Sequence, residues 1–114
     1  MNIEQLRKFC LALPGATEDI KWGNDLCFNV GGKMFTVTSA DSSEGGVSMK
    51  TTPEKFAELT EQDGIRPAHY VARYHWITIE DLNAVSQAEL KQLIRESYQL
   101  VFDKLPAKIK KSIA

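Results

Sequence analysis

The chain has little of what marks a disulfide scaffold or a membrane protein. It holds two cysteines among 114 residues, Cys10 and Cys27, and both fall within apolar patterns. We therefore expect buried structural thiols and no disulfide framework. No run approaches the roughly 20 apolar residues that a membrane helix needs. The first residues also lack a basic segment followed by an apolar one, so we expect a cytoplasmic protein with no membrane partner.

Signals for a metal site or for catalysis are scarce as well. His69 and His75 are six residues apart and far in sequence from both cysteines, which is not a zinc-ligand spacing. The Gly31-Gly32-Lys33 segment lacks the G-x-x-x-x-G-K-[ST] spacing of a phosphate-binding loop and joins two apolar runs. We found no serine with a neighbouring histidine. We therefore expect no metal, no cofactor and no enzymatic activity.

The chain also lacks an excess of either charge. Its net charge is −1 and its isoelectric point is about 6.1, which disfavours strong sequence-independent binding to polyanions. The two halves differ, however, because residues 1–64 hold six Lys/Arg and ten Asp/Glu, whereas residues 65–114 hold eight and five. The halves therefore carry −4 and +3. After Asp103 the chain has four lysines and no acid, so we expect any polyanion to contact the second half.

The clearest structural signal is a β-hairpin within Leu26–Val37. Two alternating apolar runs flank Gly31-Gly32, and glycine adopts the positive φ angles of a two-residue hairpin turn at little steric cost. Strict alternation predicts Phe35 and Val37 on one face of the sheet, with Met34, Thr36 and Thr38 on the other. The same reasoning predicts a third strand over Val47–Thr51, with Ser48 and Lys50 on a more polar, open face that has Lys50 in its middle.

The remaining segments predict helices around this sheet. Expected N-caps are Asn2, Thr52 and Ser86, and an apolar stripe of helical spacing runs from Leu90 to Leu105 before Pro106. Trp76–Ile79 predicts a fourth strand. Thr17–Trp22 is expected to be a polar connection, and Ile65–His75 an irregular segment with a possible short strand near Tyr70. The result is a single domain over residues 1–114, an α+β two-layer sandwich with an antiparallel meander and helices packed on one face.

One constellation suggests a function. Cations interleaved with aromatic rings suit nucleic acid, because cations pair with phosphates and rings stack on unpaired bases. Such residues occur at Lys33, Lys50, Arg66, Arg73 and Lys104, with Tyr70, Tyr74 and Trp76 nearby. A role for Trp76 in the core is the alternative.

The order of several short motifs resembles the MmcQ/YjbR-like family. The matching residues are Pro14-Gly15, Trp22-Gly23, Val30 to Phe35, Lys50, Pro67 before Tyr70, His75-Trp76 and Ser97-Tyr98 before Leu100-Val101. The resemblance covers about Ile3 to Leu105. It implies a CyaY-like α+β fold and a proposed double-wing DNA-binding arrangement, in which hairpin tips straddle nucleic acid. On this sequence it places the DNA-binding surface at the Gly31-Gly32-Lys33 tip and at Lys50, Arg73, His75 and Trp76.

Two functions remain open from the sequence. The first is a non-enzymatic, monomeric DNA-binding protein that contacts phosphates through Lys33, Lys50, Arg66, Arg73 and the lysine-rich tail. The second is a module that binds a protein or small ligand, suggested by the balanced charge and by the rings of Trp22, Tyr74 and Trp76. Clustering of the cations on one exposed surface would favour the first.

Overall fold

The computed structural model describes residues 1–21, 23–39, 46–68 and 74–113. These residues form a six-stranded antiparallel sheet in the order β1-β2-β3-β4-β6-β5. The strands are β1 (Thr17–Lys21), β2 (Asp25–Val30), β3 (Lys33–Ser39), β4 (Val47–Lys50), β5 (Ile65–Pro67) and β6 (Trp76–Ile79). The helices are α1 (Ile3–Leu11), α2 (Pro53–Leu59), α3 (Gln87–Asp103) and α4 (Ala107–Ile113). The predicted α+β class and the meander β2-β3-β4 are confirmed.

Helices α1, α2 and α3 begin at the residues that the sequence predicts. The Asn2 side chain accepts a hydrogen bond from Gln5 N (2.8 Å), and the Gln5 side chain accepts one from Asn2 N (3.0 Å). Thr52 and Ser86 cap α2 and α3 in the same way, each accepting from the backbone NH three residues later. These bonds satisfy NH groups that the first turn of a helix leaves unpaired.

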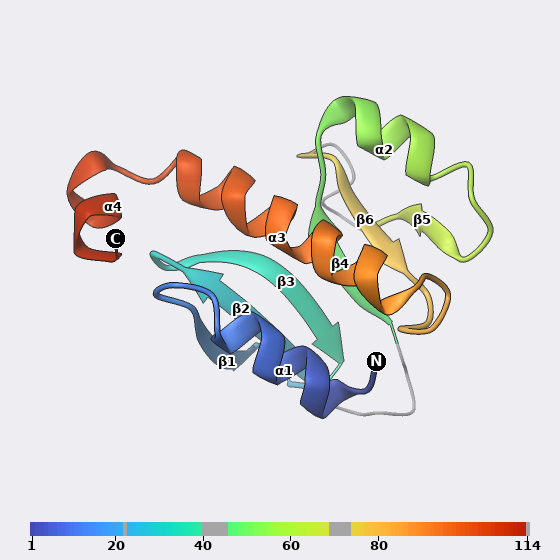
Figure 1. Cartoon of the computed structure of the whole chain (residues 1–114), viewed down its shortest axis with the longest axis horizontal. Coiled ribbons are helices and arrows are strands. Elements are labelled where there is room, and N and C mark those ends of the chain that lie inside the picture. Colours follow the sequence, from blue (N-terminus) through green and yellow to red (C-terminus); the bar gives the residue numbers. More distant parts are fainter. Residues whose placement is uncertain (22, 40–45, 69–73, 114) are drawn as a thin grey trace.

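The main core lies between one face of the sheet and the helices. Helices α1 and α3 lie across that face, as Figure 1 shows. The fully buried side chains of the core come from the helices and from the strands that they cover, and they include Leu6, Phe28, Phe35, Ile77 and Ile94. Both cysteines are buried and free, and burial raises the pKa of the Cys10 thiol to about 12, so it stays protonated at neutral pH. The predicted buried thiols are confirmed.

The predicted hairpin is present, but a β-bulge changes the faces of its second strand. Gly31 and Gly32 have φ angles of 58° and 81°, as the tight turn requires. Phe28 pairs with Thr36 and Asn29 pairs with Met34, so Phe35 is the extra residue. Phe35 and Thr36 are both fully buried, and Phe35 packs edge-on against Tyr98 of α3. The strict alternation predicted for this strand is therefore wrong at Phe35 and Thr36.

Two strands occupy segments that the sequence predicts as irregular. The expected polar connection forms β1 at one edge of the sheet, and Ile65–Pro67 forms β5 at the other. An edge strand needs hydrogen bonds on one side alone and is only partly buried, so polar side chains and a proline are tolerated there. The strand predicted near Tyr70 and the Trp22 ring lie outside the described residues.

Candidate nucleic-acid interface

Lys50 lies at the end of a central strand and is held by a helix. It is the last residue of β4 and is half-buried, whereas the sequence placed it in the middle of the polar face. Its backbone NH donates to Ser97 Oγ at 2.9 Å, and the same hydroxyl donates to the Phe35 carbonyl at 2.6 Å. Ser97 is fully buried in α3. Its hydroxyl therefore bridges β3 and β4 next to the bulge and fixes the backbone of Lys50.

Lys104 approaches Lys50 from the end of the same helix. It is the C-cap of α3, seven residues after Ser97. Seven residues are about two helical turns and about 10.5 Å along the axis, so the two residues lie on the same side of α3. The pKa of Lys50 is lowered, first by burial and second by the positive charge of Lys104. The structure thus brings together two lysines that are 54 positions apart in the sequence.

The hairpin tip and α4 bring further lysines to the same end of the molecule. A Cβ atom at Gly31 would lie 2.6 Å from Leu105 Cδ1 and 3.1 Å from Ile109 Cγ2, so the tip touches α4 and the residues before it. A Cβ atom at Gly15 would lie 2.8 Å from Ile113 Cγ2. Figure 1 shows α4 beside the β2–β3 turn. We call the lysines gathered here the basic end, namely Lys33, Lys50, Lys104, Lys108, Lys110 and Lys111.

The basic end has no carboxylate partner among the described residues. The ion pairs found among the described residues join Arg7 to Glu4 and Glu18, Lys55 to Glu96, and Arg66 to Glu80, and none includes a lysine of the basic end. The carboxylate of Asp103, the acid next to Lys104, accepts from Gln99 Nε2 at 2.6 Å. Lys110 lies 6.0 Å from the centre of the Phe102 ring, which carries no net charge. Positive charge at this end is therefore not neutralised within the described residues.

The other predicted site residues lie elsewhere or are less accessible. Arg66 is on edge strand β5 and pairs with Glu80 at 3.6 Å, which lowers its availability to phosphate. The His75 ring packs edge-on against Phe56 of α2, with 5.7 Å between ring centres. Trp76 is 8% exposed, which fits the alternative of a structural ring. Arg73 lies outside the described residues. The structure thus brings together Lys33, Lys50 and Lys104 from the predicted set.

His75 has an uncommon backbone conformation next to the end of β4, where Lys50 lies. Its φ angle is 66°, in the left-handed region that few residues other than glycine adopt. Its carbonyl accepts from both Thr51 N (2.9 Å) and Thr51 Oγ1 (2.8 Å). These two bonds hold the turn that leads into Trp76, which pairs with Lys50 in the β4–β6 ladder.

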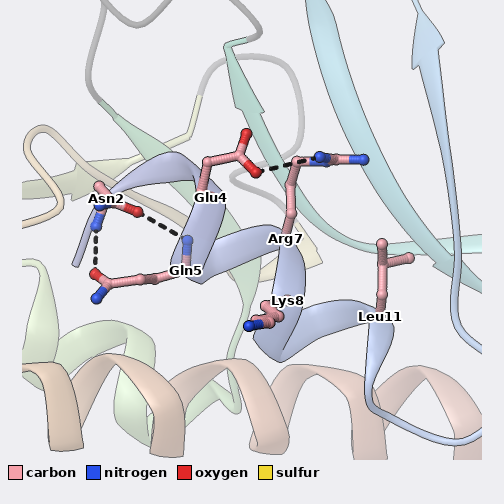
Figure 2. Close-up of a pocket in the computed structure, with 6 residues that line it drawn as sticks. All are labelled: Asn2, Glu4, Gln5, Arg7, Lys8 and Leu11. Atoms are coloured by element: carbon pink, nitrogen blue, oxygen red, sulfur yellow. Dashed lines mark hydrogen bonds and ion pairs between the residues drawn. The ribbon is translucent and has the colours of Figure 1, made fainter.

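A shallow pocket lies on α1, away from the basic end. It has a volume of about 340 Å³ and is lined by Asn2, Glu4, Gln5, Arg7, Lys8 and Leu11. Figure 2 shows that its polar side chains already bind one another, through the Asn2–Gln5 cap and the Glu4–Arg7 ion pair. Arg7 also makes two hydrogen bonds to Glu18. These groups have little capacity left for a ligand, so we assign the pocket no function.

Metal and membrane sites are not found in the described part of the chain. No group of three or more His, Cys, Asp or Glu side chains there could hold a metal ion. None of the helices formed by residues 1–21, 23–39, 46–68 and 74–113 is long and apolar enough to cross a membrane.

Ser97 is the residue of this site whose role the sequence did not predict. A serine within the apolar stripe of α3 was the available signal, because a buried hydroxyl needs hydrogen-bond partners. Its partners could not be named from the sequence, since they lie on β3 and β4, 62 and 47 positions away.

These features define an α+β protein with an antiparallel sheet, helices on one face and a basic end. Comparison with known proteins gives the family. The YjbR family model matches residues 11–100, and the chain therefore belongs to the YjbR family.

Relatives and solved structures agree with this assignment. The uncharacterized protein YjbR of Escherichia coli K12 is 29% identical over 116 residues, which cover 97% of this chain and 96% of that protein. The uncharacterized protein YbdF of Escherichia coli O157:H7 is 28% identical, with 96% and 92% coverage. The crystal structure of Deinococcus radiodurans protein DR2400, which has domain DUF419, matches this chain with a TM-score of 0.88 and 28% sequence identity. The match covers 98% of this chain and 87% of the DR2400 chain. A Pseudomonas syringae protein at 23% identity and a TM-score of 0.73 shares the fold, over 89% of this chain and 99% of its own.

Proposed function

We propose that this protein binds DNA through the basic end and acts by binding, without catalysis. The observation that carries this proposal is the gathering of Lys33, Lys50, Lys104 and the lysines of α4 at one end of a chain whose net charge is only −1. Affinity for nucleic acid comes mainly from cations that neutralise phosphates. A local cluster can supply these contacts when the overall charge cannot.

The arrangement of the cluster supports this proposal. Lys33 follows the β2–β3 turn, Lys50 ends β4, and Lys104 is the C-cap of α3, so three separate elements present cations. Cations on several elements can follow a phosphate backbone, whereas a single helix presents one line of charge. The cations of α3 nearer its start point elsewhere, because Lys91 and Arg95 lie over the Phe9 ring of α1, 5.6 and 5.1 Å from its centre.

A charge-reversal pair tests the proposal. Binding to fluorescein-labelled 20-base duplex and single strands is measured by anisotropy at low salt for the wild type, Lys50→Glu and Lys21→Glu. Both variants change the net charge by the same amount. Lys21 is the control because it ends β1 at the opposite end of the sheet from the hairpin tip. We expect Lys50→Glu to weaken binding by about tenfold or more and Lys21→Glu to change it by less than about twofold.

Two results would contradict the proposal. One is no binding of wild-type protein to either DNA at tens of micromolar protein. The other is equal weakening by both variants, which would mean that net charge and not the basic end controls the interaction.

A further inference from the structure

The two edges of the sheet differ in how well they can accept a further strand. Strands β1 and β5 form the edges, because they stand at the two ends of the strand order. β5 has three residues, and one of them is Pro67, which has no backbone NH to donate. β1 has the five residues Thr17–Lys21 and contains neither proline nor glycine. Among the described strands, only β2 pairs with β1. The outer edge of β1 is therefore the one that can pair with another strand.

Ile20 is an exposed apolar residue on this edge. It pairs with the buried Leu26 of β2, so its side chain lies on the face of the sheet that carries the helices. Among the described residues, Ile20 is the most exposed of the large hydrophobic side chains, at 55%. Helix α1 thus leaves this part of β1 largely uncovered. A second apolar side chain placed opposite Ile20 would remove apolar surface from water.

Two opposite charges flank Ile20 on the other face of the sheet. Successive side chains of a strand alternate between faces, so Asp19 and Lys21 point away from the helices. Asp19 accepts a hydrogen bond from Asn29 Nδ2 at 2.8 Å, and Lys21 lies opposite Asp25 of β2. Neither Asp19 nor Lys21 belongs to an ion pair within the described residues. The order acid, isoleucine, lysine is complementary to itself when it is read in the opposite direction.

Charge selects one register for pairing β1 with an antiparallel copy of itself. A two-fold axis perpendicular to the sheet relates the copies, and residues that lie opposite each other share a face. An axis at Glu18, Asp19 or Lys21 places two like charges directly opposite each other, which is destabilising. An axis at Thr17 leaves most of the strand unpaired. An axis at Ile20 places Ile20 opposite the partner's Ile20, and Asp19 opposite the partner's Lys21 on both sides of the axis.

We propose that two copies of this chain associate through β1 in this register and form one continuous antiparallel sheet. The Ile20 pair lies on the helix face, and two Asp19–Lys21 pairs lie on the other face. The contact is short and belongs to the small, transient class of interfaces, so we expect a dissociation constant of about 0.1–1 mM. The chain is then mostly monomeric at the protein concentrations of the DNA titrations. This inference therefore does not rest on the proposed function.

Exchanging the two charges tests the pairing. Sedimentation equilibrium of the full chain between about 10 µM and about 2 mM should show a mass that rises from 12.8 kDa toward twice this value. Asp19→Lys places lysines opposite each other and should weaken association by about tenfold or more. Adding Lys21→Asp to this variant restores opposite charges and should return the dissociation constant to within about threefold of wild type. Asp63→Lys is the control, because this exposed residue lies before β5 and its replacement changes the net charge equally.

Cysteine crosslinking tests the register separately. Residues directly opposite each other on adjacent strands have Cβ atoms about 4.5–5.5 Å apart, which brings two cysteines within reach of a disulfide. The native Cys10 and Cys27 are buried. With oxidised glutathione, Ile20→Cys should form a covalent dimer at least about tenfold faster than Asp19→Cys or Thr17→Cys.

Each outcome has a consequence. A mass that stays at 12.8 kDa up to about 2 mM overturns the inference and leaves the proposed function standing. Equal weakening by Asp19→Lys and Asp63→Lys also overturns it, as does a folded double variant that fails to regain association. Crosslinking that is fastest at Asp19→Cys or Thr17→Cys overturns the register. Circular dichroism checks the fold of every variant, and Ile20→Cys keeps both charges, so it decides where the double variant does not fold.

Discussion

Ser97 connects the core to the candidate interface through one hydroxyl group. The bulge at Phe35 leaves its carbonyl and the Lys50 amide for Ser97 Oγ, which bonds both. A buried polar group that loses its partner costs more than the bond itself is worth, because it stays desolvated. The same contact therefore stabilises the fold and fixes the position of a lysine at the basic end.

Replacing this hydroxyl should be measurable as stability. We expect Ser97→Ala to lower the free energy of unfolding by about 1–3 kcal/mol, because the buried Phe35 carbonyl and the part-buried Lys50 amide lose their partner. Ser112 is the matched control, since its exposed hydroxyl donates to Ile109 O within α4, and Ser112→Ala should change stability by less than about 0.5 kcal/mol. Urea denaturation followed by circular dichroism measures both. Similar losses in the two variants would contradict this role for Ser97.

The elements show which features local sequence can predict. Helix starts at Asn2, Thr52 and Ser86 were predictable because a cap acts within three residues. The turn at Gly31-Gly32 was predictable for the same reason. The bulge was not, because it depends on the register between two strands and on Tyr98 of a distant helix. Edge strand β1 was also missed, since its polar sequence lacks the alternation of a half-buried strand.

The two glycines of the hairpin turn give a matched pair for testing how the turn packs against α4. Both have positive φ, so alanine costs about 1 kcal/mol or more at either position. A Cβ atom at Gly31 would meet Leu105 at 2.6 Å, whereas one at Gly32 would meet nothing within 4 Å. We expect Gly31→Ala to be more destabilising than Gly32→Ala by about 1–3 kcal/mol in thermal or urea denaturation. Equal effects would mean that the turn does not pack against Leu105.

The contact between α1 and β1 should depend on pH. Arg7 lowers the pKa of Glu18, mainly through their hydrogen bonds, against an opposing effect of desolvation. A carboxyl group with a lowered pKa in the folded state stabilises the protein above its ordinary pKa, and this contribution is lost as pH falls through the lowered value. We expect Glu18→Gln to be less stable than wild type at pH 7, with the difference disappearing at acid pH. A difference in denaturation midpoint that stays constant down to pH 3 would contradict this.

At the scale of the whole molecule, charge is distributed unevenly although its sum is close to zero. The sequence predicted that the second half is positive, and four of the six lysines of the basic end come from it. It did not predict that Lys33 and Lys50 of the first half would join them, because that depends on α4 packing against the hairpin tip and on α3 holding the end of β4. Arg66 belonged to the predicted set, but Glu80 pairs with it.

Salt dependence measures how many of these cations act together. If all six lysines of the basic end contact phosphates on duplex DNA, the slope of log affinity against log salt should be about −5. Removing one contact with Lys111→Gln should make the slope less steep by about 1, and Lys21→Gln should leave it unchanged. Anisotropy titrations at four salt concentrations give these slopes. A wild-type slope between 0 and −1 would contradict a multi-lysine interface.

The bridge at Ser97 also couples motion of the helix to the sheet. In an ordinary ladder the amide proton of Lys50 would exchange with solvent when neighbouring strands separate. Here that proton is held by α3, so its exchange reports displacement of the helix. An event that displaces α3 would therefore break the bond between Ser97 and the Lys50 amide, and would free the end of β4 and the Lys50 side chain to move together.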